Sequence, residues 1–189
     1  MIRTICLTAL LLALAGPASA HPGHEASGFL HPFTGIDHLL AMVGVGMWAA
    51  FLAVRKPAAA LLVPAAFLAM MAIGAAAGFA GIKLPIVEAV ILGSVFVFGG
   101  LLMAAVRLPS ASAMAVAGLF AVFHGYAHAL EAPASGAGAY ILGFLAATTL
   151  LQAVGLGLGW AALRAVGDLG LRVLGGAVVA GGALVLVTN

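Results

Sequence analysis

HPFTGIDH, residues 31–38, places two histidines and an aspartate at the start of a long apolar segment. A second stretch, FHGYAHALE at residues 123–131, ends another apolar segment. Its His124, His128 and Glu131 are spaced by four and three residues, which puts them on one face of a helix. Ionisable side chains are rare within membrane-spanning segments and usually have a function there. The function of the chain therefore depends on whether these two stretches meet.

The composition is that of an integral membrane protein. Hydrophobic residues make up 65% of the chain and charged residues 6%, and the mean hydropathy is +1.28. Soluble domains carry about a quarter charged residues, so this chain needs the lipid bilayer as its partner. The net charge is only +2. Its basic residues occur singly or as one pair and form no basic patch, which excludes nucleic acid as a partner.

Residues 1–20 are expected to be a cleavable signal peptide. They contain a basic residue, Arg3, an apolar run at residues 5–15 and a small-residue cleavage site at residues 18–20. Cleavage there makes His21 the first residue of the mature chain. The single cysteine, Cys6, lies in this leader, so the mature chain has no thiol for disulfides, thiolate metal sites or thiol catalysis.

Residues 21–35 are expected to form a short periplasmic segment ahead of the first span. The start of this segment is polar and lacks hydrophobic periodicity. Its His21 and His24 either are incidental residues of a flexible tail or capture a metal ion, and the sequence leaves both readings open.

Six apolar segments follow, each close to the ~20 residues needed to cross a hydrocarbon core of about 30 Å. Short connections with proline, glycine or charged residues separate them. The sequence therefore predicts an all-α, integral membrane six-helix bundle in one domain, residues 36–189. The expected spans are residues 36–54, 58–80, 84–106, 113–130, 139–163 and 169–187.

A cleaved leader places the mature N-terminus on the periplasmic side of the bacterial inner membrane, and six spans return the C-terminus to the same side. The positive-inside rule supports this orientation independently, because only Lys83 falls at an outer end. The basic residues at inner ends are Arg55, Lys56, Arg107, Arg164 and Arg172.

The same orientation brings ionisable residues of three spans to the outer face, because the first and third spans begin there and the fourth ends there. The residue types did not impose this convergence, so we expect a single metal site at that face. An inverted three-plus-three repeat of the transporter kind does not explain it, since inversion would move the first motif to the inner face. The expected site residues are His31, Asp37, His38, Glu88, His124, His128 and Glu131.

The three acidic residues also have structural interpretations. Asp37 fits a capping box, TGID at residues 34–37, in which the threonine and the acid bind free helix amides. Glu88 suits the positive end of a helix dipole. Glu131 lies at the negative end of a helix, so it requires a nearby cation, either a protonated histidine or a metal ion.

Glycines and polar residues elsewhere in the spans are expected to serve packing. Glycine pairs at four-residue spacing let membrane helices approach closely. For a polar cluster in the fifth span we expect hydrogen bonds to a neighbouring helix, with lining the inner half of a path as the alternative. The glycine pairs are Gly74 with Gly78 and Gly155 with Gly159, and the polar residues are Thr148, Thr149 and Gln152.

The two motifs resemble those of the HupE/UreJ proteins, membrane accessory proteins of hydrogenase and urease systems. The family's His-Pro-x-x-Gly-x-Asp-His motif matches residues 31–38, and its His-Gly-x-Ala-His motif with a following acid matches residues 124–131. The likeness covers essentially the whole chain, leader included. Two positions depart from it: Ala129 stands where the family often has glycine, and Tyr126 where some members have another histidine. The resemblance implies nickel permeation, with cobalt or other divalent ions in some relatives.

We therefore expect a permease, not an enzyme, that supplies a divalent metal ion to hydrogenase or urease maturation. Imidazole with carboxylate suits Ni²⁺, Zn²⁺, Cu²⁺, Co²⁺ or Fe²⁺, whereas Mg²⁺ and Ca²⁺ prefer oxygen alone. Among these ions the resemblance puts Ni²⁺ first, with Co²⁺, Zn²⁺ or Cu²⁺ as alternatives. The chain has no phosphate-binding GxxxxGK[ST] loop, so the membrane potential is the expected driving force.

Two other functions stay open at this point. One is a haem-binding membrane electron carrier with His38 and His124 as axial ligands. The other is an intramembrane metal-dependent hydrolase in which Glu88 or Glu131 activates a metal-bound water. The sequence also does not fix the oligomeric state, a homo-oligomer included.

Overall fold

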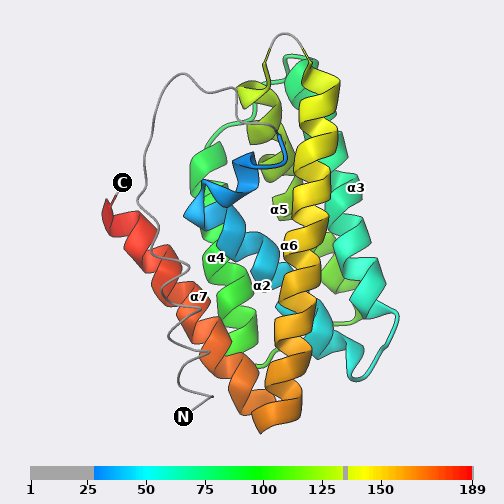
Figure 1. Cartoon of the computed structure of the whole chain (residues 1–189), viewed down its shortest axis with the longest axis vertical. Coiled ribbons are helices and arrows are strands. Elements are labelled where there is room, and N and C mark those ends of the chain that lie inside the picture. Colours follow the sequence, from blue (N-terminus) through cyan, green and yellow to red (C-terminus); the bar gives the residue numbers. More distant parts are fainter. Residues whose placement is uncertain (1–27, 134–135, 189) are drawn as a thin grey trace.

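The computed structural model describes residues 28–133 and 136–188, so the expected signal peptide, His21 and His24 lie outside the described residues. Within these ranges the chain is all-helical, as the sequence predicts, with six α-helices and one short 3-10 helix (Figure 1). The elements are η1 (His31–Phe33), α2 (Ile36–Ala53), α3 (Ala59–Phe79), α4 (Val87–Met103), α5 (Ser110–Glu131), α6 (Ala137–Val166) and α7 (Asp168–Thr188).

Five of these helices are long and apolar enough to cross a membrane, and α4 is an apolar helix of 17 residues. The chain is thus a multi-pass membrane protein. The helix α4 is shorter than the expected span 84–106 because a left-handed residue flanks each of its ends. Ile86 has φ 53° before the helix, and Ala105 has φ 53° after it.

The C-terminal end of α4 forms a Schellman motif around Ala105. The amide of Val106 donates to the carbonyl of Leu101 at 2.8 Å, and the amide of Ala105 donates to that of Leu102 at 3.0 Å. This motif usually has glycine at the left-handed position. Alanine gives no sequence indication of the turn, so hydropathy alone extends the predicted span too far.

The helices pack mainly as three pairs, α2 with α6, α3 with α5, and α4 with α7. Glycines bring the backbones together in each of the first two pairs, as predicted. A Cβ added at Gly74 would collide with the carbonyl oxygen of Val122, and one at Gly155 with the carbonyl oxygen of Val43. Such close approach is how helices associate in lipid, where hydrophobicity alone gives no driving force.

This pairing stays the same when the first three α-helices are exchanged for the last three. The contact of α2 with α6 becomes that of α5 with α3, and α4 with α7 maps onto itself. A three-plus-three repeat would produce this symmetry, but only the three main pairs share it, because the contact of α2 with α4 has no counterpart between α5 and α7 among the described residues. The histidine motifs do not share it, so any repeat concerns the scaffold and not the polar residues.

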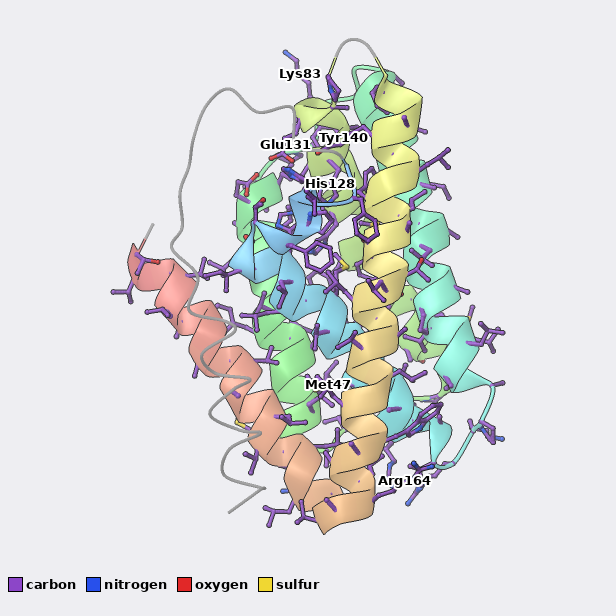
Figure 2. All side chains as sticks on the ribbon, in the orientation of Figure 1. Met47, Lys83, His128, Glu131, Tyr140 and Arg164 are labelled. Atoms are coloured by element: carbon purple, nitrogen blue, oxygen red, sulfur yellow. The ribbon has the colours of Figure 1, made fainter. Side chains whose placement is uncertain are left out.

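The polar residues divide the bundle into two ends, which Figure 2 shows at the top and the bottom. Lys83, His128, Glu131 and Tyr140 lie at one end, called here the histidine end, where α2 begins and α5 ends. Arg164 lies at the opposite end. This basic end also contains the connections α2–α3 and α4–α5, which carry Arg55, Lys56 and Arg107.

Candidate metal centre

The 3-10 helix η1 holds His31 over the end of α5. Residues 28 and 29 pack tightly on the start of α6, since a Cβ at Gly28 would collide with the carbonyl oxygen of Tyr140. The hydroxyl of Thr34 donates to the carbonyl of His31 at 2.7 Å, which closes the short helix. The ring of His31 thereby lies 5.0 Å, between centroids, from the ring of His128.

The predicted capping box at residues 34–37 is wrong. The N-cap of α2 is Gly35, whose backbone is extended and which has no side-chain cap bond. The Thr34 hydroxyl is instead bound to η1. Asp37 accepts the backbone amide of His38 at 2.8 Å and lies 3.0 Å from Nδ1 of the same histidine. The carboxylate therefore holds the His38 ring at the start of α2.

The hydrogen bonds of two histidines determine which ring nitrogen is free. Nδ1 of His38 faces the Asp37 carboxylate at 3.0 Å, and Nδ1 of His124 faces the carbonyl of Phe120 at 2.9 Å. Both partners only accept hydrogen bonds, so Nδ1 carries the proton in each ring. The lone pair then lies on Nε2, as in histidines that ligate metals through Nε2 while Nδ1–H is held by a second group.

Four imidazoles and two carboxylates come together at the histidine end. His38 lies with its ring centroid 5.2 Å from that of His124 and 5.0 Å from that of His128. Nε2 of His31 lies 2.6 Å from the Glu131 carboxylate, which is 3.8 Å from Nδ1 of His128. Figure 2 shows His128 and Glu131 at the same end of the bundle. We call this group the histidine cluster: His31, Asp37, His38, His124, His128 and Glu131.

Donor atoms in this cluster fit a metal ion. Within residues 28–133 and 136–188, Nε2 of His38, Nε2 of His124 and both ring nitrogens of His128 are buried without a hydrogen-bond partner. Such groups destabilise a fold unless something else binds them. In addition, one ligand atom each from His31, His128 and Glu131 falls within 4.8 Å of the others.

Aromatic side chains surround the buried imidazoles. Phe144 stacks on His128 with centroids 4.5 Å apart, and Phe67 lies 5.7 Å from His124. The apolar rings exclude other hydrogen-bond partners and limit how far the imidazoles can turn. A ligand entering this shell would therefore find rings that are already oriented.

Exposure falls steadily through the cluster. The side chain of Glu131 is 48% exposed and that of His31 26%, while His38 is 12% exposed and His128 fully buried. His124 is also fully buried and lies seven residues before Glu131, about 10 Å along the helix axis. The cluster thus reaches from the surface into the bundle.

Glu88 is the one expected site residue that the structure does not bring into the cluster. It is exposed in the first turn of α4, and among the described residues it belongs to no ion pair and to no metal-ligand group. Its position agrees with the alternative interpretation, an acid at the positive end of a helix dipole.

The two departures from the family motif contact α3 and the α3–α4 connection. The hydroxyl of Tyr126 accepts the backbone amide of Leu84 at 3.3 Å, which ties the α3–α4 connection to α5. Ala129 packs beside Gly78, where an added Cβ would lie 2.7 Å from the alanine Cβ. Both residues therefore serve helix packing.

The expected interhelical hydrogen bonds of the polar residues in α6 are wrong. Thr149 donates to the carbonyl of Leu145 in its own helix at 2.8 Å. Thr148 and Gln152 are buried, and their side chains have no hydrogen-bond partner in the described part of the chain. Sequence reasoning also missed Tyr140, whose ring lies 5.8 Å from that of His31. A residue at every fourth position from Tyr140 to Gln152 lies on the same face of α6. This spacing would have shown that Tyr140 shares a face with Thr148 and Gln152.

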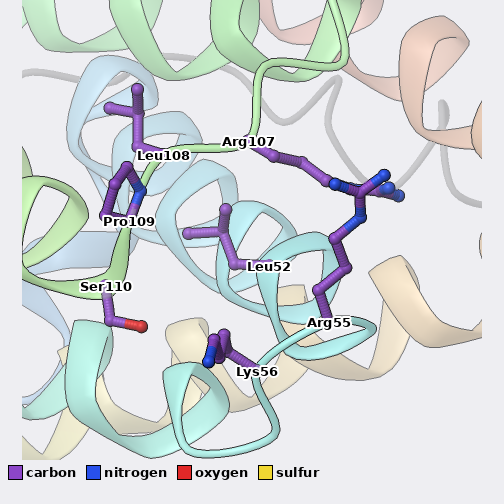
Figure 3. Close-up of a pocket in the computed structure, with 7 residues that line it drawn as sticks. All are labelled: Leu52, Arg55, Lys56, Arg107, Leu108, Pro109 and Ser110. Atoms are coloured by element: carbon purple, nitrogen blue, oxygen red, sulfur yellow. The ribbon is translucent and has the colours of Figure 1, made fainter.

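A cavity of about 310 Å³ opens at the basic end (Figure 3). Its lining has no imidazole and no carboxylate, and its charged members are all cationic. Such a cavity repels a metal cation, so the histidine cluster is the better candidate. The lining residues are Leu52, Arg55, Lys56, Arg107, Leu108, Pro109 and Ser110.

Comparison with known proteins gives two matches that span nearly the whole chain. The model of the family described as HupE / UreJ protein matches residues 9–185. The protein named "Protein HupE" of Rhizobium leguminosarum bv. viciae is 44% identical over 188 residues, which cover 97% of this chain and 97% of that protein. No solved structure matches this chain.

Proposed function

The chain belongs to the HupE/UreJ family of hydrogenase and urease accessory membrane proteins, and from this premise we propose that it is a permease for a divalent transition metal ion, Ni²⁺ before Co²⁺, Zn²⁺ or Cu²⁺. The ion is the cargo, and the histidine cluster is its binding site. The metalloenzyme that receives the ion is a hydrogenase or a urease.

One observation carries this proposal, namely the free lone pairs that lie buried inside the cluster. Nε2 of His38 and Nε2 of His124 are fixed as acceptors by the partners of Nδ1, and both are buried without a hydrogen bond among the described residues. Imidazole nitrogen is a preferred ligand of Ni²⁺, Cu²⁺ and Zn²⁺. A transition metal ion would bind lone pairs that have no other partner.

The gradient of exposure suggests how an ion moves. Glu131 and His31, the exposed members, attract the hydrated cation and provide its first protein ligands. His128 and His38 then replace water molecules, and His124 receives the ion at the buried end. Moving two positive charges inward is worth roughly 4 to 5 kcal/mol per 100 mV of membrane potential, so uptake needs no nucleotide.

The two other functions considered from the sequence have less support. The rings of His38 and His124 meet edge to face with centroids 5.2 Å apart, which leaves no room for a porphyrin plane between them. For a hydrolase, Glu88 would be one of two candidate bases, and it is exposed and outside the cluster.

We place the histidine end on the periplasmic side of the inner membrane, with both termini periplasmic. The basic residues of the opposite end support this orientation through the positive-inside rule. Fusion of alkaline phosphatase after residue 189 should give an active enzyme, whereas an inactive phosphatase fusion with an active cytoplasmic reporter would contradict it.

Reconstituted liposomes test the function. The purified protein is inserted into vesicles that contain a metal-sensitive dye, and an inside-negative potential is imposed. We expect Ni²⁺ to enter faster than into protein-free vesicles, and faster still as the potential grows. The same vesicles rank Co²⁺, Zn²⁺ and Cu²⁺ against Ni²⁺. Absence of entry for all four ions would contradict the proposal.

A further inference from the structure

The face of α6 that points into the bundle continues past the histidine cluster. Tyr140, Phe144, Thr148 and Gln152 follow at four-residue intervals, so they lie on one face of the helix, and all four are buried. Phe144 stacks on His128. Thr148 and Gln152 therefore lie one and two turns further along α6 than the contact with the cluster.

These two side chains differ from their neighbour Thr149. Thr149 satisfies its hydroxyl on the carbonyl of Leu145, which is the usual solution for a threonine in a helix. Thr148 is 0% exposed and Gln152 2%, yet neither the Thr148 hydroxyl nor either end of the Gln152 amide has a hydrogen-bond partner within residues 28–133 and 136–188. Unpaired polar groups destabilise a membrane interior, so apolar residues of the same shape would pack more stably there.

The contact between α2 and α6 leads from the cluster to this pair. A Cβ added at Gly46 would collide with the backbone carbonyl oxygen of Gln152, so the two residues are adjacent. Gly46 lies eight residues after His38 in α2, about 12 Å along the helix axis. Thr148 and Gln152 thus lie deeper in the bundle than the imidazoles, in the direction of the basic end.

We propose that Thr148 and Gln152 form a second cation site, an oxygen-donor station that receives the divalent metal ion, with part of its water shell, from the histidine cluster. This inference rests on the proposed permease function. The hydroxyl and the amide oxygen supply neutral oxygen ligands, and the same groups hydrogen-bond the water molecules that the ion retains.

The chemistry of this station suits release. Ni²⁺ prefers imidazole to neutral oxygen, so the second site binds the ion more weakly than the cluster. A path that conducts needs successive sites that bind well enough for the ion to arrive and weakly enough for it to leave. Oxygen donors placed beyond the imidazoles meet this requirement.

The test compares matched variants of the whole protein in the vesicles described above. Thr148→Val and Gln152→Leu remove the polar groups with little change of shape, and Thr149→Val is the control from the same helix. Calorimetry measures Ni²⁺ binding to each protein in detergent. We expect the double variant to lose uptake by about tenfold, while its Ni²⁺ affinity stays that of the parent because the cluster is intact, and while its melting temperature stays equal or rises.

Further variants keep the result decisive. Thr148→Ser retains the hydroxyl, so its uptake should be close to that of the parent, unlike the uptake of Thr148→Val. If Gln152→Leu does not accumulate, uptake by Thr148→Val alone tests the second site. Parental uptake in the double variant would overturn the station and leave the permease function intact. Lack of Ni²⁺ uptake by the parent itself would overturn both. Equal losses in Thr149→Val and in the double variant would also overturn the station, because they would show a packing effect.

Discussion

The two ends of the bundle carry opposite sets of polar groups. The histidine end holds four imidazoles and two carboxylates, several of whose donor atoms are buried and unbonded among the described residues. At the basic end, Arg107 already has partners, since it lies 3.4 Å from Asp168 and 3.9 Å above the Phe51 ring. The difference teaches that the histidine end offers buried, unbonded lone pairs to a cation, while the charged groups that line the cavity at the basic end all donate hydrogen bonds.

This contrast assigns the two ends different tasks in the proposed function. Metal selection belongs to the histidine end, because imidazole nitrogens discriminate transition metals from Mg²⁺ and Ca²⁺. In the same proposal, the basic end fixes the orientation of the chain in the membrane through the positive-inside rule. Substitutions at the basic end should therefore leave metal binding unchanged, and substitutions at the histidine end should leave the orientation in the membrane unchanged.

The largest effect is expected from His124→Ala. This change removes a fully buried imidazole from the inner end of the cluster, and Ni²⁺ uptake should fall by about 100-fold or more, since even outer-shell changes at metal sites cost 10- to 100-fold. Lys56→Ala, in the lining of the basic cavity, is the control and should retain uptake. Similar losses in the two variants at equal expression would remove the distinction between the ends.

A smaller loss is expected from Asp37→Asn. The carboxylate lies 3.0 Å from Nδ1 of His38 and increases the electron density available at Nε2, which an uncharged amide does less well. Ni²⁺ affinity measured by calorimetry should weaken by about tenfold. Asp168→Asn makes the same chemical change at the basic end and should leave the affinity unaltered. If both variants bind as the parent does, Asp37 has no role in the site.

The smallest of these effects is expected from Glu131→Gln. Glu131 is half exposed, so its charge acts mainly by attracting the cation to the cluster, and uptake at low ionic strength should fall about fivefold. The loss should shrink as salt screens the charge. A loss that does not depend on salt would show that Glu131 contributes only as a ligand and not through the attraction of its charge.

Hydropathy and residue spacing predict most of the fold. They give the all-helical bundle and the close packing at Gly74 and Gly155, because apolar length and glycine spacing directly reflect what a bilayer requires. They misplace the ends of α4, where Ile86 and Ala105 adopt left-handed conformations. Neither residue type indicates such a turn, so its cause lies in the tertiary structure.

The sequence predicts only part of the candidate site, because tertiary structure determines the rest. Counting which helix ends share a face brings His31, Asp37, His38, His124, His128 and Glu131 together, and the structure places these six side by side. The same reasoning includes Glu88, which the structure leaves exposed. A shared membrane face does not determine which way a side chain points around its helix axis, and that rotation follows from helix packing.

The central claim is that imidazoles from two helices bind one ion, and calorimetry on the purified protein tests it most directly. Parent protein and the triple variant with His38→Ala, His124→Ala and His128→Ala are titrated with Ni²⁺, after circular dichroism has shown equal helix content. The account predicts saturable binding of a single ion by the parent and loss of that binding in the triple variant. Equal affinity in the two proteins would contradict it.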